Sequence, residues 1–179
     1  MKRLPLGSSF SALSVAVVLS ACAAKPLTPV EAVAAKKLAP YKQACVEVTA
    51  ADAKWKNQSE ILTAALVDRM KDKKAFTNIA PCKGKAVAKA LKVKVEITNY
   101  TGGSAALNAF TGAGAAEVNF KLDFWDGEKK IGSYLGHTDS KQKYTWAGNQ
   151  FGDLEGKTMR NAAAEITILV TKNKEGEKY

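Results

Sequence analysis

The sequence has few of the residues from which disulfide frameworks and metal centres are built. Its 179 residues include 3 cysteines and a single histidine. Three cysteines are too few for a disulfide-dense toxin scaffold, and a metal site usually draws on several His, Cys or carboxylate ligands. No cluster of such ligands is visible along the chain, so the sequence predicts no metal and no cofactor.

Arginine and long apolar runs are scarce as well. Only 3 of the 27 basic residues are arginine, and few aromatic residues stand among the lysines. Nucleic-acid surfaces usually combine both, so no nucleic-acid partner is predicted. The apolar stretch at 10–18 is far shorter than the roughly 20 residues of a transmembrane helix, which excludes a polytopic membrane protein. The remainder, 46% apolar and 25% charged, is typical of one globular domain.

The N-terminus predicts the compartment. A basic start, Met1-Lys2-Arg3, and a short apolar stretch indicate a secretory signal peptide over 1–21. The residues Leu-Ser-Ala-Cys at 19–22 resemble a bacterial lipobox. This resemblance implies cleavage before Cys22 and acylation of that cysteine, for example with palmitate. The expected partner is therefore a membrane, bound through the lipid anchor. Ala23, directly after that cysteine, resembles the sorting signal of outer-membrane lipoproteins, which predicts an anchor in the outer membrane and a domain facing the periplasm. Ordinary cleavage beside a stray cysteine is the alternative.

Two cysteines remain once Cys22 is assigned to the anchor. An even number in an oxidising compartment predicts one disulfide between Cys45 and Cys82. Closing a loop of about 38 residues contributes roughly 4 kcal/mol in the chain-entropy model. Neither cysteine lies in a Cys-x-x-Cys motif, so no redox role is predicted. Two free thiols are the alternative.

Composition divides the mature chain into three parts. Residues 22–40 are rich in Ala, Pro and Lys and predict a tether, with a short helix over 30–38 as one option. Residues 41–172 predict a periplasmic domain, and residues 173–179 a polar tail.

The patterning of the domain predicts an α+β fold, a mixed sheet of about five strands with helices on one face. An alternating run at 44–50, a helix opened by Asn57 with Glu60 three residues later, and a short apolar run at 76–79 predict a parallel strand–helix–strand unit. Alternating runs at 91–98, 117–124 and 131–137 predict an antiparallel meander with one solvated face. Residues 153–172 predict a C-terminal helix packed on that sheet, and a strand over 165–171 is the alternative.

Positive charge is concentrated in one part of the chain. From Cys22 onward there are 25 basic and 17 acidic side chains, a net +8, and residues 54–94, with 11 basic and 3 acidic, account for all of it. Such a stretch attracts lipid head groups, lipopolysaccharide phosphates or cell-wall carboxylates. A solubilising face is the alternative. The candidate anion-binding residues are Lys71, Lys73, Lys74, Lys83 and Lys85.

A glycine-rich stretch at 101–116 is a second conspicuous feature. It contains Gly112-Ala113-Gly114 but precedes a strand, and Glu117 stands where a phosphate-binding loop has its third glycine. The stretch therefore predicts a connection between strands and no nucleotide site.

The remaining polar residues give little support to catalysis. Ser133, His137 and Asp139 are the residue types of a hydrolase, but they are neighbours on one strand and lack a nucleophile elbow. An envelope hydrolase is therefore the weakest alternative. A group of carboxylates at a predicted turn is interpreted as solvated rather than as an acid/base pair: Asp123, Asp126 and Glu128. An exposed aromatic surface for a partner could be formed by Trp125, Tyr134, Tyr144 and Trp146.

The order of elements carries a family resemblance. The run Phe-Thr-Gly-Ala-Gly-Ala-Ala at 110–116 leads into Val-Asn-Phe-Lys-Leu-Asp at 118–123, and an Ala-rich helix ends the chain. This pattern resembles the bacterial lipoprotein family called domain of unknown function 4410 over about residues 40–171. The resemblance implies neither an enzyme nor a cofactor. The leading hypothesis is thus a non-enzymatic envelope lipoprotein, anchored through Cys22, that presents its domain to a protein or cell-wall partner as an interaction or assembly module.

Overall fold

Six strands form one mixed sheet in the computed structural model, which describes residues 27–82, 89–104, 114–141 and 153–179. The strands are β1 (Leu27–Glu31), β2 (Gln43–Ala50), β3 (Asn78–Pro81), β4 (Ala90–Thr101), β5 (Glu117–Asp126) and β6 (Lys129–Asp139). Their order across the sheet is β1-β6-β5-β4-β2-β3. The helices are a 3-10 turn (Ala53–Trp55), α1 (Lys56–Asp72) and α3 (Leu154–Glu175). The predicted α+β fold is confirmed.

The parallel strand–helix–strand unit is present. Strand β2 pairs in parallel with β3 on one side and with β4 on the other, and α1 connects β2 to β3. One face of α1 is buried against the sheet, through Leu62, Ala65, Leu66 and Met70. The apolar spacing of three and four residues explains that face.

Strands β4, β5 and β6 form the predicted antiparallel meander. Alternate residues point into the core because successive side chains of a strand face opposite sides. The buried set is Leu91, Val93, Val95, Ile97, Val118, Phe120, Leu122 and Phe124. The opposite face carries charged pairs such as Lys92 with Glu47 and Lys121 with Asp123. The sheet therefore has one covered and one solvated face.

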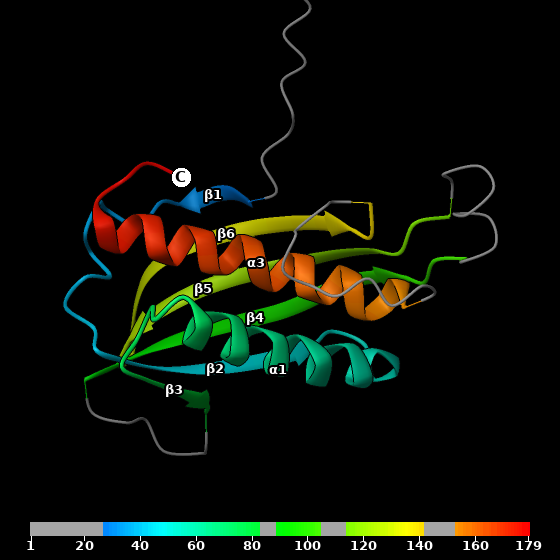
Figure 1. Ribbon diagram of the computed structural model, residues 1–179, viewed down its shortest axis with the longest axis horizontal. Helices are drawn as coiled ribbons and strands as arrows, with labels where there is room; N and C mark the ends of the chain where they lie inside the picture. The colour runs from blue at the N-terminus through cyan, green and yellow to red at the C-terminus, as the bar shows by residue number, and fades with distance from the viewer. Residues whose placement is uncertain (1–26, 83–88, 105–113, 142–152) are drawn as a thin grey trace, which may run out of the picture.

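Both helices cover the same face of the sheet (Figure 1). They run in the same direction, so their C-terminal ends lie at the same end of the molecule, on the left of the figure. The helix alternative for 153–172 is confirmed, and α3 buries Met159, Ala163, Ile166 and Val170. No helix of the described residues is long and apolar enough to span a membrane.

Glycines weaken the alternation of β6 for a packing reason. A Cβ atom at Gly136 would overlap the ring of Phe120, which packs over the glycine on the core face. At Gly132 it would overlap the side chain of Val33. Neighbouring side chains fill the space above the glycines, so the strand is continuous although its sequence pattern is interrupted.

The predicted tether is wrong from Leu27 onward. Residues 27–31 form β1, which pairs antiparallel with β6 at the edge of the sheet. Leu27 and Leu38 are fully buried. Proline is tolerated at Pro29 because an edge strand has one side without ladder hydrogen bonds. The alanines and prolines suggested a loose chain, whereas two leucines and a valine fasten it to the core.

Two element ends also differ from the sequence prediction. Asn57 does not open α1; it lies inside the helix, and its Nδ2 donates to Glu155 Oε1 at 2.8 Å. The preceding turn is capped instead by Asp52, which accepts from the Lys54 N–H. At the other terminus, α3 extends to Glu175, and Asn173 is buried. The predicted polar tail therefore begins within a packed helix.

Candidate functional site

A disulfide joins Cys45 of β2 to Cys82, the residue after β3, with Cα atoms 4.8 Å apart. The parallel pairing of β2 with β3 places Cys45 opposite Ala80, so the end of β3 lies beside β2. The backbone also contributes, since the Cys82 N–H donates to the Val46 carbonyl at 2.8 Å. The predicted pairing is present in the structure and fastens the edge strand to the sheet.

The predicted anion-binding lysines fall at the end of α1. Lys71, Lys73 and Lys74 are all exposed. Lys71 lies in the last turn of α1 and the other two directly follow the helix, at an end where the macrodipole favours cations. Lys83 and Lys85 lie outside the described residues. The structure thus places three of the five candidates on one small surface.

Other lysines, distant in sequence, join this surface. The Thr77 N–H donates to the Lys42 carbonyl at 2.8 Å, and Gln43 pairs with Ala90, so Lys42 and Lys89 lie near the end of α1. We call this surface the basic end, formed by Lys36, Lys37, Lys42, Lys71, Lys73, Lys74 and Lys89; all seven are exposed. Sequence reasoning missed Lys36 and Lys37 because they stand in the segment interpreted as a tether, and it missed Lys42 because that residue lies outside the Lys-rich region 54–94.

One lysine nearby has a structural role. Lys174 Nζ donates to the carbonyls of Tyr41 and Ala75, at 2.8 and 2.5 Å, and lies 4.2 Å from the centre of the Phe76 ring. Burial, and secondarily the charge of Lys42, lower the pKa of Lys174. Its ammonium group ties the end of α3 to the loop before β2 and to the end of α1, which holds the basic end together.

A hollow of about 650 Å³ opens at this end. We call it the basic hollow; its lining includes Lys36, Lys37, Pro40, Tyr41, Lys89 and Asp126. Burial, and secondarily a hydrogen bond to Asp126, raise the pKa of Tyr41 to about 12, so its hydroxyl stays protonated at neutral pH. Three ammonium groups therefore share the hollow with one carboxylate that already has a neutral partner.

The residues of the hydrolase alternative have other partners. Ser133 Oγ donates to Asp123 Oδ1 at 2.6 Å, and His137 Nδ1 lies 2.9 Å from Asn119 Oδ1. Ser133 and His137 are four residues apart on β6, a separation of about 13 Å in an extended strand. Asp126 and Glu128 are exposed, whereas Asp123 is 8% exposed. Among the described residues, no group of three His, Cys, Asp or Glu is arranged to hold a metal ion.

The predicted aromatic surface is wrong for Tyr134. This residue is 4% exposed, packs edge-on against Phe124 and accepts the Val33 N–H at its hydroxyl, 2.9 Å away. Trp125 is half-buried on the solvated face of the sheet. Tyr144 and Trp146 lie outside the described residues. The aromatic residues are therefore partly core, because an amphipathic ring with a satisfied hydroxyl can be buried.

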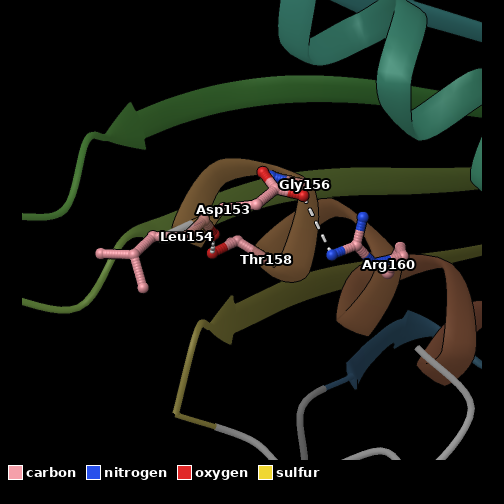
Figure 2. A network of polar contacts seen from close by, with 5 residues as sticks. All are labelled: Asp153, Leu154, Gly156, Thr158 and Arg160. Carbon is pink, nitrogen blue, oxygen red and sulfur yellow. Dashed lines mark hydrogen bonds and ion pairs between the residues drawn. The ribbon is translucent and has the colours of Figure 1, made fainter. Parts of the chain in front are cut away.

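The N-terminus of α3 is closed by its own side chains (Figure 2). Asp153 Oδ1 accepts the Gly156 N–H at 2.7 Å, and its second oxygen pairs with Arg160 at 3.0 Å. Thr158 Oγ1 donates to the Leu154 carbonyl at 2.8 Å. A capping carboxylate already occupies the position that an anion would take, so this helix end offers no ligand site.

Comparison with known proteins gives a family and distant similarities of fold. The PelC dodecamer structure from Paraburkholderia phytofirmans is 13% identical, with 79% of this chain and 97% of that chain covered and a TM-score of 0.44. Protein XCC0632 from Xanthomonas campestris is 11% identical, with 82% and 97% covered and a TM-score of 0.47. A search of curated proteins finds no match. The family described as "Domain of unknown function (DUF4410)" matches residues 26–159, which is most of the chain, and the protein therefore belongs to this family.

Proposed function

We propose that the protein is a lipid-anchored lipoprotein of the bacterial cell envelope, held in the outer membrane through Cys22 and facing the periplasm. There it serves as a non-enzymatic interaction or assembly module. The observation that carries the proposal is the disulfide between Cys45 and Cys82. Structural disulfides persist in oxidising compartments such as the periplasm, and this agrees with the signal peptide and lipobox pattern at the N-terminus.

The position of β1 sharpens the proposal. Only residues 23–26 separate Cys22 from Leu27, the first residue of β1. The five Cα–Cα steps from Cys22 to Leu27 span at most about 17 Å, so an acylated Cys22 would keep the edge of the sheet close to the membrane surface. A partner would then be met near the membrane and not at the end of a long tether.

The non-enzymatic part of the proposal is supported by where the candidate catalytic groups lie. Ser133 binds Asp123 and His137 contacts Asn119, so the histidine does not face the serine hydroxyl as a Ser-His pair requires. A binding role is the simpler use of such a domain. Loss of a hydrolytic activity in His137→Ala would contradict it.

Lipidation is tested by labelling growing cells with an alkyne-bearing palmitate and isolating the protein. The wild type should carry the label and fractionate with outer membranes, while Cys22→Ser should carry none and appear in the soluble periplasmic fraction. Cys45→Ser serves as the matched control, because it removes a cysteine without touching the anchor. Label on Cys22→Ser, or none on the wild type, would refute the anchor.

A partner is tested by photocrosslinking in intact cells. Leu135 lies on the solvated sheet face and is 53% exposed, so a photoreactive residue there faces outward. The same residue at Asp68, exposed on α1, is the control. We expect a discrete crosslinked protein from position 135 only. No specific product from either position, together with no envelope phenotype on deletion, would contradict the interaction module.

A second candidate function is binding of an anionic envelope ligand by the Lys-rich region 54–94. The exposure of Lys71, Lys73 and Lys74 at one surface supports it. Binding to anionic vesicles should weaken as salt rises, because screening shortens the reach of surface charges. Replacing the three lysines by glutamine should weaken binding further, and unchanged binding would exclude this region.

A further inference from the structure

We propose that the basic hollow is a binding site for a phosphate group, contacted by the side chains of Lys36, Lys37 and Lys89. This inference deepens the second candidate function and rests on it for the source of the ligand. It differs in its residues, since none of the three was a candidate from sequence and two lie outside region 54–94.

Positive charge from two separate segments converges on the hollow. Lys36 and Lys37 come from the loop after β1, whereas Lys89 directly precedes β4, and the fold brings them to one hollow. Within the described part of the chain, no carboxylate forms an ion pair with any of the three. Three ammonium groups act as point charges that can surround a tetrahedral oxyanion, while a planar carboxylate is better matched by an arginine fork. The chemistry therefore favours phosphate.

The backbone of the basic end has unusual dihedral angles. Among the described residues, the non-glycine residues with positive φ are all lysines of the basic end: Lys36 at 60°, Lys74 at 51° and Lys89 at 65°. Side chains other than glycine, asparagine and aspartate adopt this left-handed conformation at a cost. Lys74 follows a helix end, where the conformation is common. Lys36 is the third residue of a turn closed by the Lys37 N–H, which donates to the Ala34 carbonyl at 3.0 Å, and this position takes a positive φ. Lys89 lines the same hollow, and strain at such a residue is typical of ligand sites.

The size and polarity of the hollow also suit a phosphate ester. A hollow of about 650 Å³ exceeds what a bare phosphate fills and lies within the range of small-molecule sites. The carboxylate of Asp126 lies beside the lysines and is held by the Tyr41 hydroxyl. It can accept a hydrogen bond from a hydroxyl or ammonium group next to the phosphate. The expected ligand is thus a phosphate ester with such a group, either free or as a lipid head group.

The experiment uses the full chain with Cys22→Ser, so that no acyl chain interferes. Binding of glycerol 3-phosphate and of inorganic phosphate is measured by calorimetry, and binding to phosphatidylcholine vesicles with and without phosphatidylglycerol by sedimentation. The test variant is Lys36→Gln/Lys37→Gln/Lys89→Gln. The matched control, Lys71→Gln/Lys73→Gln/Lys74→Gln, removes the same charge from the same end but leaves the hollow intact.

The test variant should bind glycerol 3-phosphate on the order of 1,000-fold more weakly, because it lacks three charge-assisted contacts and each is worth about tenfold. The control should bind glycerol 3-phosphate within about twofold of the unsubstituted protein, because Lys71, Lys73 and Lys74 do not line the hollow. Its binding to anionic vesicles should weaken as the second candidate function predicts. Binding of glycerol 3-phosphate would identify a free ester as the source, and binding of phosphatidylglycerol vesicles alone a head group. Equal weakening of glycerol 3-phosphate binding in the two variants would overturn the site.

A single substitution separates ligand binding from folding. Lys89→Gly should raise the melting temperature by relieving the left-handed backbone and should weaken phosphate binding about tenfold. Unchanged binding in this variant would overturn the role of Lys89. Vesicle binding that is lost in the control variant and kept in the test variant would reject the hollow and leave the second candidate standing. If the protein with all of its lysines bound none of the probes, both the hollow and the second candidate function would be rejected.

Discussion

Opening the disulfide should destabilise the domain strongly. The bond joins residues 37 apart in sequence, and the enclosed chain contains all of α1 and β3. Constraining an unfolded loop of that length contributes about 4 kcal/mol in the chain-entropy model. Typical domains are stable by only about 5–15 kcal/mol, so this is a large share of the total.

The perturbation is Cys45→Ser/Cys82→Ser in a Cys22→Ser background, compared with the same background keeping both cysteines. For a domain of this size, 1 kcal/mol corresponds to about 2–4 °C in melting temperature. The double variant should therefore melt roughly 10 °C lower, as followed by circular dichroism. Cys45 lies half-buried on the solvated sheet face, so serine there leaves no cavity in the core.

Reduction gives an independent measure of the same quantity. Adding reductant to the protein with both cysteines should lower its melting temperature to that of the double variant, and should leave the double variant unchanged. Alkylation followed by intact mass should find no free thiol before reduction and two afterwards. A melting temperature within about 2 °C in all states, or two reactive thiols in the unreduced protein, would refute the bridge as a stabilising element.

Three further perturbations test the packing. Gly136→Ala should lower the free energy of unfolding, measured with urea, by about 1–3 kcal/mol, because the new Cβ would overlap the Phe120 ring. The control Gly102→Ala should change it little, because no atom lies within 4 Å of its Cβ. Asn173→Ala should cost about 1–3 kcal/mol and speed amide exchange in residues 33–38, because its side chain bonds the backbone of that segment; unchanged exchange would contradict this anchor. Burial raises the pKa of Glu165 above 4.5, against a weaker opposing hydrogen bond from Tyr179. The folded state then holds that proton more tightly than the unfolded one, so ionisation of this carboxyl lowers the free energy of unfolding as pH rises above about 4.5. Glu165→Gln should make that decline with pH less steep. An unaltered dependence of the free energy of unfolding on pH would contradict this explanation.

The local elements were predictable from sequence because their signals are local. Alternation in β4 and β5 and the apolar face of α1 follow from the period of each element, and these stretches bury the expected residues. The cysteine pair was predictable from number and compartment. The cap at Asn57 was wrong because an extra turn begins at Asp52 and places Asn57 inside the helix.

The candidate site was predictable only in part. Lys71, Lys73 and Lys74 belong to one helix end, which sequence can place. Lys36 and Lys37 reach the same surface because residues 27–40 are fastened to the core through Leu27 and Leu38, and no periodic signal marks such a segment.

By itself the sequence determined the class of the fold, the strand and helix types, the cysteine pairing and the excess of lysine. Each of these depends on composition or on neighbours within a few residues. Only the tertiary structure decided that β1 completes the sheet, that Tyr134 is core, and that lysines from two distant segments meet at one hollow. Those facts depend on contacts between residues far apart in sequence, such as Asn173 with Leu38 and Lys174 with Tyr41, which no local pattern encodes.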